Sequence, residues 1–159
     1  MEDKTEQRID YKSQSPSAFD AILSLSKHAS GTGLGPELLN LVYMRASQIN
    51  GCAWCLDMHS KDARAAGETE QRLYMLPAWR EVPFYTEREK AALEWTEAVT
   101  LVASTHVPEE AYNVARRQFN EKELVDLTIA IIAINGWNRL NVAFRTEVGE
   151  YGAGQHSEK

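Results

Sequence analysis

The stretch that decides the fold is RASQINGCAWCLDMHSKDARAAGE, residues 45–68, which contains both cysteines of the chain and one of its four histidines. Asn50 and Gly51 tolerate a left-handed backbone, so they predict the end of one helix. A second helix is expected over residues 52–66, closed by Gly67. A Cys-x-x-Cys motif also occurs in thioredoxin-like domains, but that fold needs a strand leading into the motif, and here a helix leads into it.

Cys52, Cys55 and His59 share one face of the expected helix. Positions i, i+3 and i+7 fall within about 60° of one another around a helix. Both cysteines lie in its first turn, where unpaired amide groups and the helix dipole stabilise a thiolate. His59 is one turn, roughly 6 Å, from Cys55 and two turns, roughly 10 Å, from Cys52. We therefore expect His59 to hydrogen-bond Cys55, which makes Cys55 the predicted nucleophile and Cys52 its resolving partner.

Two other interpretations of these three residues are open. Paired cysteines and a histidine on an inner helix face can be plain core packing. A zinc site normally needs four ligands, and only three candidates are local, so zinc would require a remote ligand or a partner chain. The usual second pair of ligands is absent from the sequence. We therefore predict neither a metal nor another cofactor here.

Helix signals recur along the rest of the chain. Proline stands at the expected first turn of three helices, and two capping boxes open two more. Pro77 and Pro83 bracket a predicted loop. The predicted helices cover residues 16–30, 36–50, 52–66, 69–76, 86–104, 108–119 and 121–145.

The apolar stretch LTIAIIAINGWN, residues 127–138, is the one segment that can also be interpreted as a buried strand. Its length, its alanines and the capping box before it favour a helix packed on several sides. Since no βαβ alternation or hairpin signal appears, we predict a compact all-α, multi-helix fold. Residues 1–159 are expected to form a single domain, with an ordered helical core over about 11–146 and a mobile tail over 147–159.

Composition and charge narrow the range of partners and locations expected for the protein. The 159 residues, 43% hydrophobic and 25% charged, have the size and make-up of one ordinary globular domain. A net charge of −6 argues against nucleic acid as a partner, because phosphate binding draws on clustered Lys and Arg. No signal peptide is visible, and no apolar run approaches the ~20 residues that cross a bilayer. We expect a cytoplasmic protein without membrane contact, where a cysteine pair is more often redox-active or metal-binding than structural.

The segments SQINGCAWCLDMHSKDARAAGE (47–68) and INGWNRL (134–140) resemble the AhpD-like alkylhydroperoxidase branch of the carboxymuconolactone decarboxylase superfamily. The helical order over residues 11–146 is similar to that of the small single-domain members. The resemblance implies an all-helical subunit that assembles into homo-oligomers, commonly trimers or hexamers. It also implies an antioxidant peroxidase that reduces hydroperoxides with its cysteine pair and is itself reduced by an external thiol or protein dithiol. The decarboxylase branch generally does not use this pair, which argues against lactone decarboxylation.

The resemblance also implies a role for each residue of the motif. The peroxidatic cysteine of the family matches Cys55, and the resolving cysteine matches Cys52. The family histidine, which takes part in a proton relay, matches His59. These roles agree with the ones expected from the reach of His59 along the helix.

One position departs from the family pattern. The family relay commonly includes a glutamate twelve residues before the first cysteine, and that position here is Asn40. An asparagine hydrogen-bonds a neighbour or a water but does not exchange a proton as a carboxylate does. Glu37, one turn earlier, is either a substitute acting through water or only a first-turn acid favoured by the helix dipole. Slower peroxide turnover or a changed substrate is the expected consequence.

Other polar and aromatic residues of interest lie outside the motif. Asn135, Asn138 and Arg139 interrupt an apolar helix and are expected to bind loop backbone or a neighbouring subunit. Trp54 and Trp137 are expected in the core or at an interface. Two alternatives to a peroxidase are a protein dithiol oxidoreductase or redox sensor, and a non-enzymatic oligomeric helical protein that keeps the motif without efficient turnover.

Overall fold

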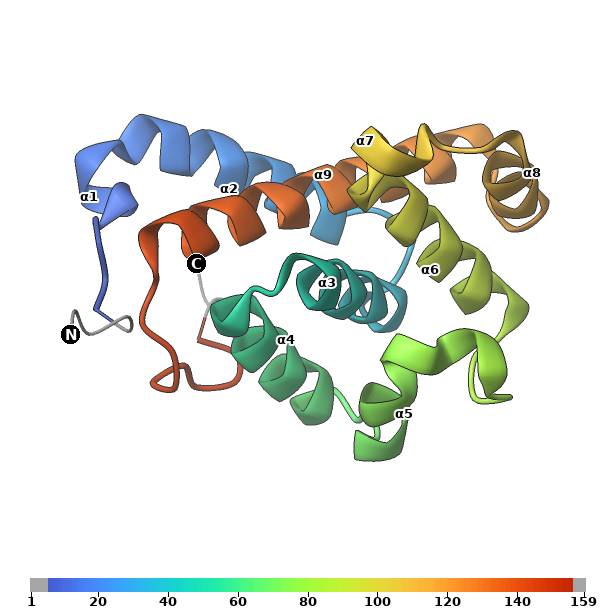
Figure 1. Cartoon of the computed structure of the whole chain (residues 1–159), viewed down its shortest axis with the longest axis horizontal. Helices are drawn as coiled ribbons and strands as arrows, with labels where there is room; N and C mark the ends of the chain where they lie inside the picture. The colour runs from blue at the N-terminus through green and yellow to red at the C-terminus, as the bar shows by residue number, and fades with distance from the viewer. Residues whose placement is uncertain (1–5, 156–159) are drawn as a thin grey trace.

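The computed structural model describes residues 6–155 of the chain. That part of the chain contains helices and no strand, so the all-α prediction is confirmed (Figure 1). None of its helices combines the length and the apolar character that crossing a membrane requires. The elements are α1 (Tyr11–Gln14), α2 (Pro16–Ser30), α3 (Pro36–Asn50), α4 (Ala53–Ala65), α5 (Glu70–Met75), the 3-10 helix η1 (Leu76–Glu81), α6 (Glu87–Thr100), α7 (Val102–Thr105), α8 (Glu109–Gln118) and α9 (Glu121–Phe144).

Most helix ends lie where the sequence predicts them. Pro16 and Pro36 occupy the first turns of α2 and α3, where a missing N–H costs no hydrogen bond. The capping box of α6 forms between Thr86 and Glu89, and α9 opens with a second capping box of the same kind. Local sequence chemistry therefore sets where the long helices start.

Three segments differ from the expectation. The short helix α1 precedes the first predicted helix. The predicted loop between the prolines contains η1, because Pro77 suits the first turn of a helix as well as it suits a loop. The helix predicted over 86–104 is interrupted at Leu101, which separates α6 from α7. There the Thr105 hydroxyl donates to the carbonyl of Ala98 over 2.7 Å, so a side chain satisfies a carbonyl near the helix end.

Helix α3 is the centre of the molecule. It contacts α4, α6 and α9, and Figure 1 shows it between α9 and α4. Its buried side chains belong to three core clusters. Val42 lies in one with residues of α6, α8 and α9, Leu41 in one with residues of α4, α5 and η1, and Ala46 in the one that holds both cysteines. Full burial of a valine or leucine side chain stabilises the fold by about 1.5–3 kcal/mol.

Helices α2 and α9 run side by side (Figure 1). The side chain of Ile22 on α2 lies over Gly136 in the middle of α9, where a Cβ would lie 2.6 Å from Cδ1 of Ile22. A glycine inside a helix costs about 1 kcal/mol relative to alanine. Here the missing side chain leaves room for the end of the Ile22 side chain.

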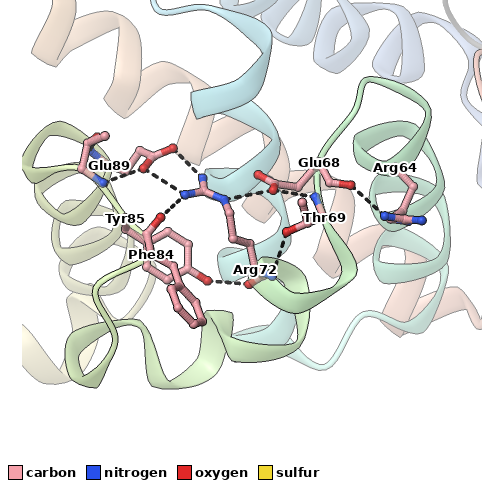
Figure 2. A network of polar contacts seen from close by, with 8 residues as sticks. Arg64, Glu68, Thr69, Arg72, Phe84, Tyr85 and Glu89 are labelled. Carbon is pink, nitrogen blue, oxygen red and sulfur yellow. Dashed lines mark hydrogen bonds and ion pairs between the residues drawn. The ribbon is translucent and has the colours of Figure 1, made fainter.

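A polar network centred on Arg72 holds α5 between α4 and α6 (Figure 2). The Arg72 guanidinium donates to Glu68 over 2.9 Å and to Glu89 over 2.6 Å. It also donates to the carbonyl of Phe84 and lies over the ring of Tyr85, 4.8 Å from the centroid. The planar guanidinium fork thus joins the segment between α4 and α5 to the start of α6.

The segment after α9 is hydrogen-bonded to α4 as far as Gly154, while the mobility expected of residues 147–159 stays a prediction. The side chain of Tyr151 is buried, and its hydroxyl donates to Asp62 over 2.9 Å. Lys61 Nζ donates to the carbonyl of Tyr151 over 3.0 Å. An aromatic side chain with a polar tip gives this glycine-containing segment an anchor. The last part of the expected tail, residues 156–159, lies outside the described residues.

Candidate functional site

The two cysteines occupy the corner between α3 and α4. Gly51 ends α3 with a left-handed backbone (φ 64°), as its sequence position predicts. Cys52 is then the N-cap of α4, and its Sγ accepts the backbone N–H of Cys55 over 3.3 Å. The prediction that both cysteines stand at the start of a helix is confirmed.

The two sulfurs lie at disulfide distance in a dry environment. The Cα atoms of Cys52 and Cys55 are 5.4 Å apart, within the usual range for a disulfide. Cys52 is 1% exposed and Cys55 is fully buried. Around them lie apolar and aromatic side chains, namely Tyr43, Ala46, Trp54, Ile134 and Trp137. The two cysteines are joined as a disulfide in the structure, so this helix start accommodates the oxidised form of the pair.

His59 is buried on the same side of α4 as Cys55 but does not contact it through a hydrogen bond. Its ring lies against that of Tyr43, with centroids 5.0 Å apart. Burial lowers the pKa of His59 to about 4, partly opposed by the charge of Asp62. The imidazole is therefore neutral at pH 7. Within residues 6–155 no hydrogen bond joins His59 to either sulfur, so the structure lacks the expected bond to Cys55.

The hydrogen-bond donor to Cys55 comes from α9 instead. Nδ2 of Asn141 donates to Cys55 Sγ over 3.4 Å. Oδ1 of Asn141 accepts from the hydroxyls of Tyr11 over 3.0 Å and Thr146 over 2.7 Å. Asn141 is 4% exposed. Sequence reasoning missed this residue, although a polar side chain one turn after Asn138 in an apolar helix was the available signal.

A second group of amides joins α9 to the end of α3. Asn50 Nδ2 donates to Oδ1 of Asn135 and of Asn138, over 3.0 and 2.9 Å. Nδ2 of Asn138 donates to the hydroxyl of Ser47 over 3.0 Å. Arg139 donates to the side-chain oxygen of Asn135 over 2.8 Å. The expectation of loop-backbone or subunit partners is wrong for the two α9 asparagines, because side chains of α3 and the Thr100 hydroxyl of α6 bind them within the same chain.

Glu37 and Asn40 lie on α3, and within residues 6–155 neither is hydrogen-bonded to a cysteine sulfur. Glu37 is exposed in the first turn, and Asn40 is half-buried one turn later. Tyr43, a further turn along α3, is the residue that touches His59. Asn40 is therefore one helical turn from Tyr43, the residue that packs on His59. In the described part of the chain no three His, Cys, Asp or Glu side chains are grouped to hold a metal ion.

Comparison with known sequences identifies the family. Residues 16–98, from α2 into α6 with both cysteines, match the carboxymuconolactone decarboxylase family. The chain is 43% identical over 137 residues to the uncharacterized protein YdfG of Bacillus subtilis (strain 168). That alignment spans 86% of this chain and 93% of YdfG.

Solved structures share the fold. ATU0492 from Agrobacterium tumefaciens, a protein of unknown function described as a candidate AhpD antioxidant defence protein, matches with a TM-score of 0.88 and 43% identity. The match covers 92% of this chain and 100% of ATU0492. The debrominase Bmp8 matches in fold alone, with a TM-score of 0.77 and 22% identity over 87% of this chain and 74% of its own. The chain thus belongs to the carboxymuconolactone decarboxylase family, in its AhpD-like branch.

Proposed function

We propose that the protein reduces hydroperoxides, with Cys55 as the attacking thiolate and Cys52 as the resolving cysteine. The observation that carries the proposal is the pair itself, held at disulfide distance in the first turn of α4. Each sulfur accepts a hydrogen bond, which favours its thiolate form. The backbone N–H of Cys55 donates to Cys52 Sγ, and the Asn141 side-chain amide donates to Cys55 Sγ.

The reaction consumes one hydroperoxide for two thiols. The Cys55 thiolate attacks the terminal oxygen of the hydroperoxide, so an S–O bond forms and the O–O bond breaks. The alkoxide leaves and takes up a proton, giving an alcohol and Cys55 sulfenic acid. The Cys52 thiol then attacks the Cys55 sulfur, the S–O bond breaks, and water departs with the Cys52 proton.

His59 is the proposed proton carrier between the thiol and the leaving oxygen. Burial lowers the pKa of His59 to about 4, which weakens the imidazole as a base but makes its protonated form a stronger acid. An alkoxide is a much stronger base than a neutral imidazole, so the second transfer is downhill. The first transfer limits this relay, because Asn40 offers no carboxylate to stabilise the imidazolium.

An external thiol or protein dithiol returns the disulfide to the reduced state. Two electrons and two protons pass to Cys52 and Cys55 through a mixed disulfide. Since both sulfurs are buried, the reductant reaches them only when neighbouring side chains move. A cytoplasmic location, where such thiols are kept reduced, fits this step.

The proposal includes a homo-oligomer, either a trimer or a hexamer. Apolar side chains stand exposed along α9, with Val125 61%, Ile132 47% and Val142 47% exposed. Val125 and Ile132, two turns apart, share one face of α9, and exposed apolar side chains on a helix face favour contact with another chain. Light scattering after gel filtration gives the mass of the particle, and a monomer would contradict this part of the proposal.

The test compares two oxidants of the reduced protein. Cumene hydroperoxide and oxidised glutathione are each mixed with reduced protein, and thiol loss is followed with time. A peroxidase loses thiols faster with the hydroperoxide, whereas a protein dithiol oxidoreductase loses them faster with the disulfide. The Cys55→Ser variant is the control and should be inert to the hydroperoxide on the same time scale.

A further inference from the structure

We infer that Asn141 is a catalytic residue that holds the Cys55 thiolate through its side-chain amide, with Tyr11 and Thr146 as the positioning residues that orient the amide. The inference rests on the proposed role of Cys55 as the attacking sulfur. Asn141 lies 86 positions from Cys55 in the chain and reaches it from a different helix.

The contacts of Asn141 determine which end of its amide faces the sulfur. Its Oδ1 accepts two hydroxyl donors, from Tyr11 and from Thr146. An amide oxygen with two lone pairs is then fully used, which leaves the NH₂ group to face Cys55 Sγ. A thiolate only accepts hydrogen bonds, so this orientation favours the thiolate over the thiol.

Burial makes this donor important. Cys55 is fully buried and Asn141 is 4% exposed, so bulk water does not solvate an anion on the sulfur. The backbone N–H of Cys55 points to Cys52 instead. Among the described residues, the Asn141 amide is the hydrogen-bond donor to the Cys55 sulfur. A fixed dipole in a dry site stabilises charge more strongly than the same dipole in water.

The start of the described chain holds Tyr11 in place. The backbone N–H of Arg8 donates to the carbonyl of Phe144 over 2.9 Å, and its side chain donates to the carbonyl of Ala143 over 3.1 Å. These bonds fasten the segment before α1 to the end of α9. The side chain of Tyr11 then reaches Asn141 across 130 positions of sequence. The N-terminal segment thereby sets the orientation of a group that touches the reacting sulfur.

The experiment measures how readily Cys55 ionises. In a Cys52→Ser background only one cysteine remains, and its rate of alkylation by iodoacetamide is followed from pH 5 to pH 10. Replacing Asn141 by leucine should move the midpoint of this profile up by about one pH unit and slow alkylation below the midpoint about tenfold. Asn138→Leu is the matched control, because Asn138 is equally buried one turn earlier but meets Ser47. Its midpoint should not move.

A second variant keeps the inference testable if Asn141→Leu does not fold, as judged by circular dichroism. Tyr11→Phe with Thr146→Val removes both hydroxyls that orient the amide without touching the sulfur, and should raise the midpoint by a smaller amount. An unchanged midpoint in the folded variants, or an equal rise in Asn138→Leu, would overturn the role of Asn141. Alkylation needs no peroxide, so it tests the role of Asn141 independently of the proposed reaction. If Asn141→Leu raises the midpoint but the wild-type protein does not react with hydroperoxides, the role of Asn141 stands and the peroxidase function is rejected.

Discussion

The backbone N–H of Cys55 donates to the sulfur of Cys52, so Cys52 is both the N-cap of α4 and one half of the cysteine pair. The Sγ atom of Cys52 thus both caps α4 and takes part in the proposed redox chemistry. The left-handed Gly51 before it fixes the direction in which α4 leaves α3. Changes to Cys52 therefore affect stability as well as chemistry, and the two effects can be separated.

The cap predicts different stabilities for two variants of Cys52 under reducing conditions. Serine is a preferred N-cap, so Cys52→Ser should unfold in urea at or above the wild-type midpoint. Alanine offers no acceptor, so Cys52→Ala should lose about 1 kcal/mol. Equal stability of the two variants would show that the sulfur does not cap the helix.

His59 predicts a loss of stability in acid. The pKa of His59 is about 4 in the folded chain because of burial, and about 6.5 when unfolded. Between these values the unfolded chain binds a proton that the folded chain does not, so stability falls as pH drops from 6.5 to 4. The loss reaches about 3 kcal/mol, and the contribution is complete above pH 6.5. The free energy of unfolding, measured with urea between pH 4 and pH 6.5, should fall less steeply with decreasing pH in His59→Gln than in the wild type. Parallel stability–pH curves for the two proteins would contradict this role of His59.

Restoring the family carboxylate predicts faster chemistry. If the lack of an acid beside the histidine limits proton transfer, Asn40→Glu should accelerate peroxide reduction in single-turnover assays. Asn40→Gln is the matched control, because it adds the same length without charge and should not accelerate the reaction. A folded Asn40→Glu protein with an unchanged or lower rate would show that the relay is not limiting.

The Arg72 network predicts that lysine is a poor substitute. Arg72→Lys keeps the charge but loses the fork that joins Glu68, Glu89 and the Phe84 carbonyl (Figure 2). We expect a loss of about 1–2 kcal/mol in the free energy of unfolding. Lys90→Met breaks only an outlying pair with Glu87 and should cost less than about 0.5 kcal/mol. Similar losses in both variants would mean that the geometry of the network is unimportant.

Much of the fold was predictable because its signals are local. Proline at the first turn, the capping boxes and Gly51 each act within four residues, and all lie where the structure ends or begins a helix. The segment containing η1 was ambiguous because Pro77 suits both a loop and a helix start. The packing of Tyr151 on α4 was not predictable, since its partner Asp62 lies 89 positions away.

In the candidate site, too, features set by local sequence were predictable and those set by contacts between distant segments were not. Cys52, Cys55 and His59 are within two turns of one helix, so their common side followed from helical spacing. Helical spacing does not determine the conformation of a side chain or its contacts with other helices. The His59 ring packs on Tyr43 from α3. Asn141 was missed because its role depends on a contact between α9 and α4, which no local pattern encodes.

The most direct measurement is a single-turnover titration of reduced protein with cumene hydroperoxide, in which the thiols lost are counted. Both thiols should disappear rapidly, two for each hydroperoxide consumed. In Cys52→Ser, dimedone should trap a sulfenic acid on Cys55, which mass spectrometry would locate. Thiols that react no faster than free cysteine, with no trapped sulfenic acid, would contradict the peroxidase function.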